Sequence, residues 1–417
     1  MTKPILSVVG SEANAPKDLL MEIMREGARK MLIAALEAEV DDFIAACADA
    51  RDERGKRLVV RNGHARARDI ITPLGPLEVQ TPRVNDRRRG VDGERVDAFS
   101  SKILPPYLRK TKSVEDLVPW LYLKGISTSD FPEALQALLG PGVRGFSANT
   151  VVRLKQVWEE EFRAWRKESM KGKKFVYLWA DGVYFNIRLG EGERQCVLVI
   201  IGVREDGTKE LVAMEDGVRE SRLSWKSLLA SLKERGLEGA PELAVGDGAL
   251  GFWAALAEEF PQTRIQRCWV HKTANVLNAL PKSQQVEAKN ELQEIWNSAT
   301  KADAEKAFAH FEKRYRARYP KAVECLAKDR ERLLTFYDFP AEHWKHLRTT
   351  NPIESTFATV RLRTYRTKGP GNGTAGLMMA FKLIQSASRR WRKLNEAVLL
   401  KDVVEKVEFV DGMKKAA

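Results

Sequence analysis

The sequence predicts an α/β protein in which a mixed β-sheet follows a mainly helical N-terminal region and carries an all-helical insertion. Three observations predict this fold class. Hydrophobic residues recur at helical spacing before residue 166, strand-like hydrophobic runs gather between residues 173 and 268, and no strand-like run occurs from about Val270 to Trp344. A chain of 417 residues exceeds what one hydrophobic core usually serves, so we expect two to four domains.

The charge balance predicts a polyanionic partner. The chain has 70 Lys and Arg against 57 Asp and Glu, which gives a net charge of +13 and a pI near 9.5. Such a surface attracts polyanions, of which nucleic acid is the commonest for a soluble protein. A basic protein without a polyanionic partner is the alternative.

Cysteine usage and hydropathy predict a cytoplasmic protein with no membrane partner. The four cysteines are far apart and form no Cys-x-x-Cys pair, which argues against a disulfide framework or a cysteine-rich zinc site. Residues 1–10 lack the pattern of a signal peptide. The longest apolar run, 196–203, is too short to span a bilayer.

We predict that residues 1–110 form a helical and basic region for DNA binding or oligomerisation. From Pro16 to about Ala50 the apolar spacing predicts one long helix or two shorter ones, which pack in the core or against another copy of the chain. Residues 51–90 contain eleven basic and five acidic residues, and 69–79 predicts two short strands around a turn. The arginine triplet 87–89 fits a solvated loop or a phosphate contact.

Residues 111–172 are predicted to form a helix-turn-helix-like DNA-binding domain and a connecting helix. The first helix spans about 114–123, and the second begins near Thr128 or Ser129 and ends at Leu139. The third is capped by Ser147 and continues as a long charged helix. Short connections and a polar start to the third helix match a motif whose recognition helix enters the major groove, although many helical bundles look the same. Arg153 and Lys155 on this helix are our candidate DNA contacts.

Residues 173–395 are predicted to form the catalytic domain. The expected order is strand, strand, strand, helix, strand, helix, strand. Turn-linked strands imply an antiparallel start, and helical crossovers imply parallel additions. This is the order of a ribonuclease-H-like sheet. The helical insertion covers about 270–345, and residues 396–417 are expected to be a C-terminal tail.

Two aspartates follow hydrophobic runs on strands that we expect to be neighbours. They are Asp181, after 175–180, and Asp247, after 243–246. Two close carboxylates repel each other and lose hydration, and divalent cations remove that penalty. Oxygen ligands favour Mg²⁺ or Mn²⁺, and two ions about 3.5–4 Å apart can activate an attacking oxygen and stabilise a leaving one. An Asp-Gly step is often only a turn, which is the alternative for each aspartate alone.

The third candidate ligand is Glu354. Between Lys345 and Asn395 the chain has eleven Lys and Arg residues and this single carboxylate. Asn351 is predicted to cap a helix with Pro352 at its first position, so that the positive end of the helix favours the glutamate. The bases that follow are candidate phosphate contacts, and an ordinary surface acid on a basic helix is the alternative. Those bases are Arg361, Arg363, Arg366 and Lys368.

A Cys-x-x-His pair, Cys268 and His271, follows the last predicted strand. As a metal site it is incomplete, because no second pair has suitable spacing. A supporting role beside the carboxylates and plain packing both remain open.

The motifs around Asp181, Asp247, Cys268 with His271, and Asn351–Glu354 together resemble the Mutator-type transposases of bacterial insertion sequences, the IS256 group. The resemblance runs from about Leu19 to Trp391. It implies an Asp-Asp-Glu (DDE) triad at Asp181, Asp247 and Glu354, a Cys-x-x-His signature at Cys268 and His271, and recognition of terminal inverted repeats by the N-terminal region. It also implies a bacterial, nucleoid-associated protein. Some members have alanine after the aspartates, where this chain has glycine.

The sequence therefore predicts a DNA transposase that uses two Mg²⁺ or Mn²⁺ ions to cut DNA and to transfer the freed strand. Pairing two element ends needs more than one chain, so a dimer or larger assembly on DNA is expected. A domesticated, sequence-specific DNA-binding regulator is one rival. A structure-selective nuclease on the same fold is the other.

Overall fold

The computed structural model describes residues 19–89, 94, 99–126, 130–140, 143, 148–188, 194–217, 219–248, 250–366 and 368–415. The chain divides into two compact units, Met1–Val151 and Val152–Ala417. None of the helices in the described part is long and apolar enough to cross a membrane.

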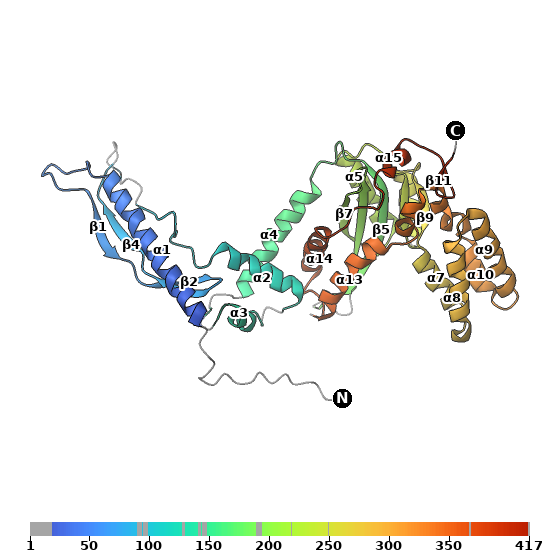
Figure 1. The fold of residues 1–417 in the computed structure, drawn as a ribbon, viewed down its shortest axis with the longest axis horizontal. Coiled ribbons are helices and arrows are strands. Elements are labelled where there is room, and N and C mark those ends of the chain that lie inside the picture. Colours follow the sequence, from blue (N-terminus) through green and yellow to red (C-terminus); the bar gives the residue numbers. More distant parts are fainter. Residues whose placement is uncertain are drawn as a thin grey trace, which may run out of the picture. The chain divides into compact units, whose positions relative to one another are not determined.

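The first unit begins with one long helix and four short strands (Figure 1). The helix is α1 (Leu19–Ala46). Strand β1 (Val59–His64) pairs antiparallel with β4 (Pro82–Asp86), and β2 (Arg68–Thr72) pairs antiparallel with β3 (Gly75–Val79). The predicted pair of strands around a turn is confirmed by β2 and β3. Strands β1 and β4 were not predicted, because most of their side chains are polar and only the first residue of each is buried.

Two further helices of this unit share a small core with β2. They are α2 (Lys112–Lys124) and α3 (Phe131–Leu139), close to the predicted bounds. Gly125 ends α2 in the left-handed region at φ 108°, which glycine adopts without strain. The expected caps Thr128, Ser129 and Ser147 lie outside the described residues. Helix α4 (Ala148–Arg166) then leads into the second unit.

The second unit is built on a mixed five-stranded sheet in the order β7-β6-β5-β8-β9. Strands β5, β6 and β7 are antiparallel neighbours, while β8 and β9 add to β5 in parallel. The predicted antiparallel start and parallel additions are confirmed. The elements are β5 (Phe175–Asn186), β6 (Arg194–Arg204), β7 (Lys209–Gly217), α5 (Arg222–Glu234), β8 (Leu243–Gly246), α6 (Leu250–Glu259) and β9 (Arg264–Arg267).

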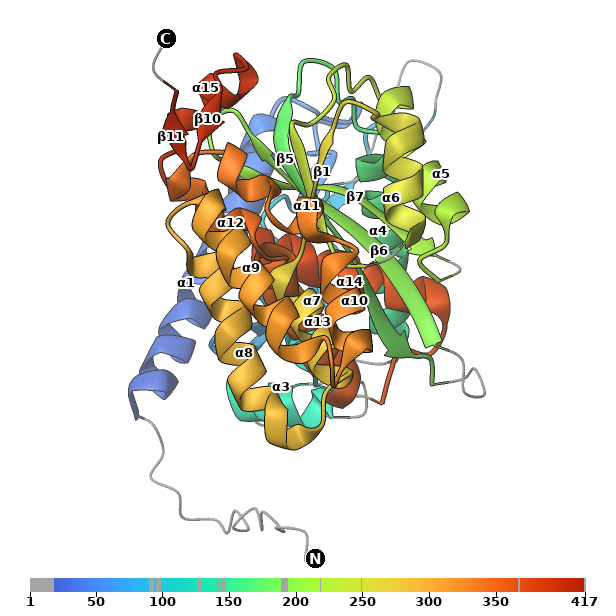
Figure 2. The same ribbon diagram turned by 90° about the vertical axis from the view of Figure 1, so that its right-hand side faces the viewer.

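Helices cover both faces of this sheet (Figure 2). Alternate residues of β5 point to opposite faces. Leu178 and Ala180 join the core with α5 and α6. On the other face, the indole of Trp179 donates to the carbonyl of His346 at 3.0 Å, and the hydroxyl of Tyr177 lies 3.0 Å from Nδ1 of His343. Helices α13 (Asn351–Arg366) and α14 (Gly373–Ser388) lie on that second face.

The segment between β9 and α13 is helical, as predicted. Its helices α8, α9 and α10 form a bundle around buried aromatic and aliphatic side chains (Figure 1). The backbone N–H of Trp269 donates to the carbonyl of Arg348 at 2.9 Å, so the two ends of the insertion meet. The helices are α7 (Trp269–Asn278), α8 (Lys282–Asn297), α9 (Lys301–Tyr315), α10 (Pro320–Ala327), α11 (Arg330–Leu333) and α12 (Trp344–Leu347), with 3₁₀ turns at Thr335–Asp338 and Ala341–His343.

The C-terminal segment, expected as a tail, is folded. It forms α15 (Leu399–Val404) and a hairpin of β10 (Phe409–Val410) and β11 (Met413–Lys414). Leu400 and Phe409 are buried, and the backbone N–H of Gly412 donates to the carbonyl of Tyr337 at 3.0 Å. The sequence did not predict this packing, because the elements are short and charged residues interrupt their apolar residues.

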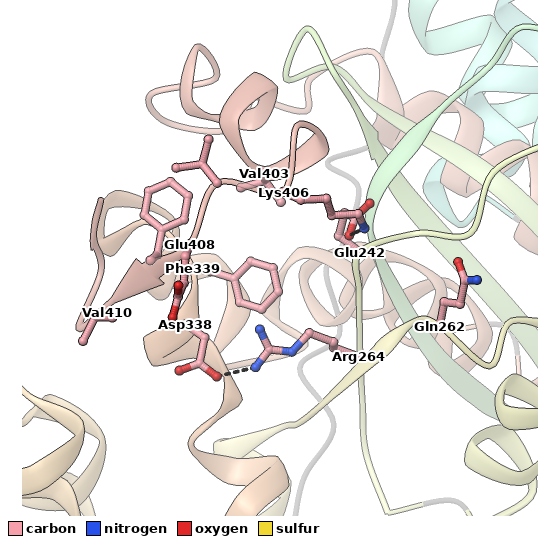
Figure 3. A pocket seen from close by; sticks show the side chains of 11 residues that line it. Glu242, Gln262, Arg264, Asp338, Phe339, Val403, Lys406, Glu408 and Val410 are labelled. Atoms are coloured by element: carbon pink, nitrogen blue, oxygen red, sulfur yellow. Dashed lines mark hydrogen bonds and ion pairs between the residues drawn. The ribbon is translucent and has the colours of Figure 1, made fainter. Parts of the chain in front are cut away.

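A hollow of about 580 Å³ separates this segment from the starts of β8 and β9 (Figure 3). Four of its charged groups pair with one another, Arg264 with Asp338 and Lys406 with Glu242. Glu242 directly precedes β8 and Arg264 begins β9, whereas Asp247 follows the end of β8. The hollow is therefore at the opposite end of the parallel strands from the candidate carboxylates.

Candidate active site

Asp181 lies within β5, opposite Val199 of β6, and only 5% of its surface is exposed. Its Oδ1 accepts a hydrogen bond from the backbone N–H of Gly182 at 2.8 Å. Its buried Oδ2 has no hydrogen-bond partner among the described residues. Burial, reinforced by the charges of Asp247 and Glu354, raises the pKa of the Asp181 carboxyl. A negative charge at this position is costly without a cation.

Asp247 directly follows β8, whose Gly246 is registered with Ala180 of β5. The predicted neighbouring strands therefore place both aspartates at the same part of the sheet. The indole of Trp253 donates to the backbone carbonyl of Asp247 at 2.9 Å and holds the turn into α6.

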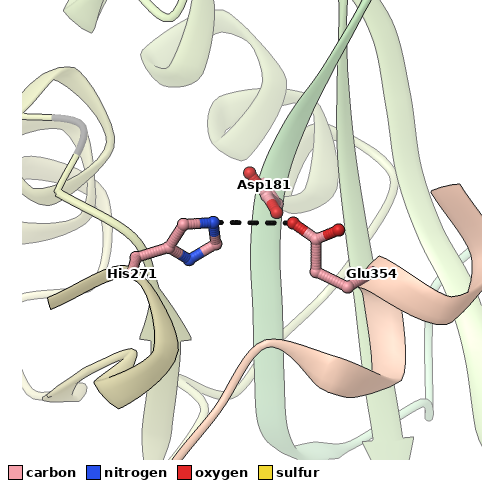
Figure 4. Close-up of side chains that lie close together, drawn as sticks. All are labelled: Asp181, His271 and Glu354. Atoms are coloured by element: carbon pink, nitrogen blue, oxygen red, sulfur yellow. Dashed lines mark ion pairs between the residues drawn. The ribbon is translucent and has the colours of Figure 1, made fainter. Parts of the chain in front are cut away.

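Glu354 enters from the first turn of α13 (Figure 4). The helix already includes Asn351, one residue earlier than predicted. One carboxylate oxygen of Glu354 lies 3.5 Å from Nε2 of His271, and the other accepts from Arg361 at 2.8 Å. These two groups, His271 first, lower the pKa of Glu354 despite its partial burial. In contrast to Asp181, this carboxylate is held in its charged form.

Cys268 and His271 belong to a hydrogen-bonded group at the start of α7. Cys268 is fully buried, and Thr350 donates to its sulfur from both the backbone N–H, at 3.3 Å, and the hydroxyl, at 3.4 Å. The same hydroxyl is 3.5 Å from Nδ1 of His271. Burial alone would raise the pKa of the Cys268 thiol, but His271 and Thr350 outweigh it and the pKa is lowered. Interaction with Cys268 and Glu354 raises the pKa of His271.

In the described part of the chain, Asp181, His271 and Glu354 come together as potential metal ligands. One ligand atom from each lies within 4.8 Å of the others. Asp247 is outside this group, although its charge raises the pKa of Asp181. The unpartnered buried oxygen of Asp181, its raised pKa and the nearby Glu354 fit a divalent cation.

The sequence matches the family described as "Transposase, Mutator family" over residues 6–393. The chain belongs to the Mutator family of transposases. It is 53% identical over 282 residues to the transposase for insertion sequence element IS6120 of Mycolicibacterium smegmatis, covering 68% of this chain and 86% of that one. It is 30% identical over 396 residues to the transposase for insertion sequence element ISRM5 of Rhizobium meliloti (strain 1021), covering 94% of this chain and 95% of that one. This places it among the transposases of insertion sequences.

Sequence reasoning missed two site residues of this transposase, Thr350 and Glu220. Glu220 lies in the connection from β7 to α5, and burial followed by the charge of Asp247 raises its pKa to about 7. Its Oε2 is buried without a hydrogen-bond partner in the described structure. A Cβ added at Gly182 would lie 2.6 Å from Oε1 of Glu220, so glycine at position 182 leaves room for the Glu220 carboxylate. Neither residue stands in a local pattern that the sequence distinguishes.

The glycine after the second aspartate is also enclosed by a charged side chain. A Cβ added at Gly248 would lie 2.5 Å from the guanidinium nitrogens of Arg267, a buried residue that pairs with Asp329 at 3.4 Å. Gly182 and Gly248, the glycines that follow the two aspartates, are therefore both explained by close packing against a charged side chain.

The predicted DNA contacts differ in exposure. Arg153, Arg361, Arg366 and Lys368 are exposed, whereas Lys155 is partly buried. Burial, followed by the charge of Arg188, lowers the pKa of Lys155. Arg363 is only 4% exposed and belongs to the buried stripe of α13, so it cannot meet a phosphate at the surface. The burial of Arg363 therefore contradicts its prediction as a DNA contact.

Proposed function

We propose that this transposase, a member of the IS256 group, binds the terminal inverted repeats of its insertion sequence and cuts and joins DNA at a DDE triad of Asp181, Asp247 and Glu354. The observation that carries the proposal is that ligand atoms of Asp181 and Glu354 lie within 4.8 Å of each other, with Asp247 near enough for its charge to raise the pKa of Asp181. The strand order supports a ribonuclease-H-like core. The order of α2, α3 and α4 supports a helix-turn-helix.

Asp181, Asp247 and Glu354 would hold Mg²⁺ or Mn²⁺, because carboxylate oxygens are the ligands these cations prefer. Two bound ions would supply Lewis acidity to the attacking and the leaving oxygens of a phosphodiester. The cation charge would also offset the burial and the repulsion that raise the pKa of Asp181.

The chain's own residues prepare this site. His271 orients Glu354 through its Nε2, and Thr350 fixes the imidazole from the other ring nitrogen. Arg361 pairs with Glu354 and presents a positive charge beside the position of a phosphate. Arg366 at the end of α13 and Lys368 just after it continue this charge. Arg153 and Lys155 on α4 are further candidate phosphate contacts.

We further propose that residues 1–110 and 111–172 recognise the element ends, and that two or more chains assemble on DNA. Synapsis of two ends requires at least two binding units. The basic charge of this region, with eleven bases against five acids between residues 51 and 90, supports its contact with DNA.

The test is strand transfer from a duplex that carries the inverted repeats flanking the gene into plasmid DNA. Full-length protein is assayed with Mg²⁺, with EDTA and as Glu354→Gln. Joined product that requires metal and vanishes in the variant supports the proposal. Binding without cleavage or joining would instead indicate a DNA-binding regulator, and cutting without joining a structure-selective nuclease.

A further inference from the structure

A second hollow of the same unit is linked to Glu354 through Arg361. It has a volume of about 460 Å³ and is enclosed by the end of β5, the start of β6 and the C-terminal half of α13. Arg361 lines it and also donates to Glu354 at 2.8 Å. Arg361 therefore connects the hollow to the candidate catalytic carboxylate.

The lining combines positive charge with aromatic rings. Arg194, Arg361 and Lys368 contribute three cations, and the described lining residues include no acid. Tyr365 lines the hollow and exposes 86% of its surface, so its ring is accessible to a ligand. The ring of Tyr184 forms another wall, with the guanidinium of Arg194 5.7 Å from its centre.

The walls are fixed before any ligand arrives. The backbone N–H of Arg188 donates to the carbonyl of Pro370 at 2.8 Å, joining the end of β5 to the segment after α13. Gly369 has φ +92°, and a Cβ there would lie 2.1 Å from the carbonyl oxygen of Asn186. Only glycine permits this close approach, so the hollow is built into the backbone.

We propose that this hollow binds one unstacked nucleotide of the DNA strand that is cut at Glu354. Its base stacks on Tyr365, and its phosphate contacts Arg361, Arg194 and Lys368. Aromatic rings recognise the face of any base once it leaves the duplex, while cations hold its backbone. The volume of about 460 Å³ is within the range of pockets that hold small ligands, so one unstacked nucleotide can enter it. This inference rests on the proposed function, because it places the nucleotide next to the cut.

The test is a binding cycle between the protein and the DNA. Full-length wild type and Tyr365→Ala are titrated, in EDTA, with end duplexes in which one nucleotide at a time around the cut is made abasic. We expect Tyr365→Ala to weaken binding of the intact duplex by about ten-fold. At one position, the abasic change should weaken DNA binding by wild type but not by Tyr365→Ala, because each change alone already removes the stack between the base and Tyr365.

Two variants serve as controls. Tyr365→Phe keeps the ring and should bind as wild type does. Leu362→Ala removes a side chain of the same helix that is 54% exposed but does not line the hollow, and it should change nothing. Lys368→Ala should weaken binding of all duplexes equally.

Additive losses at every position, or an equal loss in Leu362→Ala, would overturn the nucleotide site. The cycle needs no catalysis, so its outcome is separate from that of the strand-transfer assay. Active transfer with purely additive binding would reject this hollow and keep the proposed function. Coupled binding without metal-dependent transfer would keep the nucleotide site in this hollow and reject the proposed function.

Discussion

Nε2 of His271 lies 3.5 Å from a carboxylate oxygen of Glu354, although their helices stand at opposite ends of the helical insertion. Two backbone N–H groups close the same junction, from Trp269 to the carbonyl of Arg348 and from Thr350 to the sulfur of Cys268. The two ends of the helical insertion are therefore held together. Their contacts fix the position of Glu354 relative to the sheet, so the insertion supports the candidate site although it supplies none of the candidate carboxylates.

Asp247→Asn should abolish cleavage and joining while leaving binding of the element ends largely intact. The substitution removes a negative charge beside Asp181 but keeps the size of the side chain and the turn held by Trp253. Strand transfer and a mobility-shift titration on the same end duplex measure the two properties. Activity equal to wild type would show that Asp247 is not a metal ligand. This test is decisive because Asp247 lies outside the group formed by Asp181, His271 and Glu354.

Asp181→Asn should stabilise the metal-free protein at high pH. The pKa of Asp181 is raised in the folded state, so the folded chain binds more protons than the unfolded chain and loses stability as pH rises toward that pKa. The asparagine carries no charge and escapes this loss. In EDTA, the melting temperature of the variant should exceed that of wild type at pH 9, and the difference should shrink at pH 5.

Added Mg²⁺ should reverse the order in the same melting experiment. Wild type gains stability from the ion, because ligand binding favours the folded state, while the variant lacks one ligand and gains less. A melting difference that is independent of both pH and Mg²⁺ would contradict the assigned role of Asp181.

The sheet was predictable because its strands are bounded hydrophobic runs, and the runs before Asp181 and Asp247 correspond to β5 and β8, although Asp181 lies within β5 and not at its end. Thr350 and Glu220 were not predictable, because their contacts join segments distant in sequence and neither belongs to a motif. Arg363 could have been assigned correctly. The buried residues of α13 recur at helical spacing, and Arg363 falls on that stripe with Phe357 and Val360. Charge alone suggested a surface role, and the periodicity outweighs it.

Thr350→Val should slow strand transfer by roughly 10–100-fold, the usual effect of removing a hydrogen bond that orients a ligand. Valine keeps the volume but cannot donate to Cys268 or contact Nδ1 of His271. Thr350→Ser retains the hydroxyl and serves as the matched control. The affinity for Mn²⁺ should fall together with the rate. A loss of melting temperature at unchanged rate and affinity would show that Thr350 only packs.

Gly182→Ala should destabilise the protein by about 1–3 kcal/mol through overpacking against Glu220. The new Cβ would lie 2.6 Å from Oε1 of a carboxylate that is itself partly buried. Truncating the partner, as Glu220→Ala, should remove most of this cost, so the double variant tests the contact in a cycle measured by urea unfolding. Strictly additive losses would mean that Glu220 is not what excludes a side chain at position 182.

Arg366→Ala and Arg363→Ala should affect different properties, although both remove an arginine from α13. Arg366 is exposed, and its loss should lower the slope of log affinity against log salt by about 0.9 on the end duplex. Arg363 lies in the buried stripe, so its loss should lower the melting temperature and leave the salt slope of the folded fraction unchanged. Titrations from low to moderate salt, with melting curves for both variants, separate these outcomes. A wild-type melting curve combined with a reduced slope in Arg363→Ala would return that residue to the DNA-contacting surface.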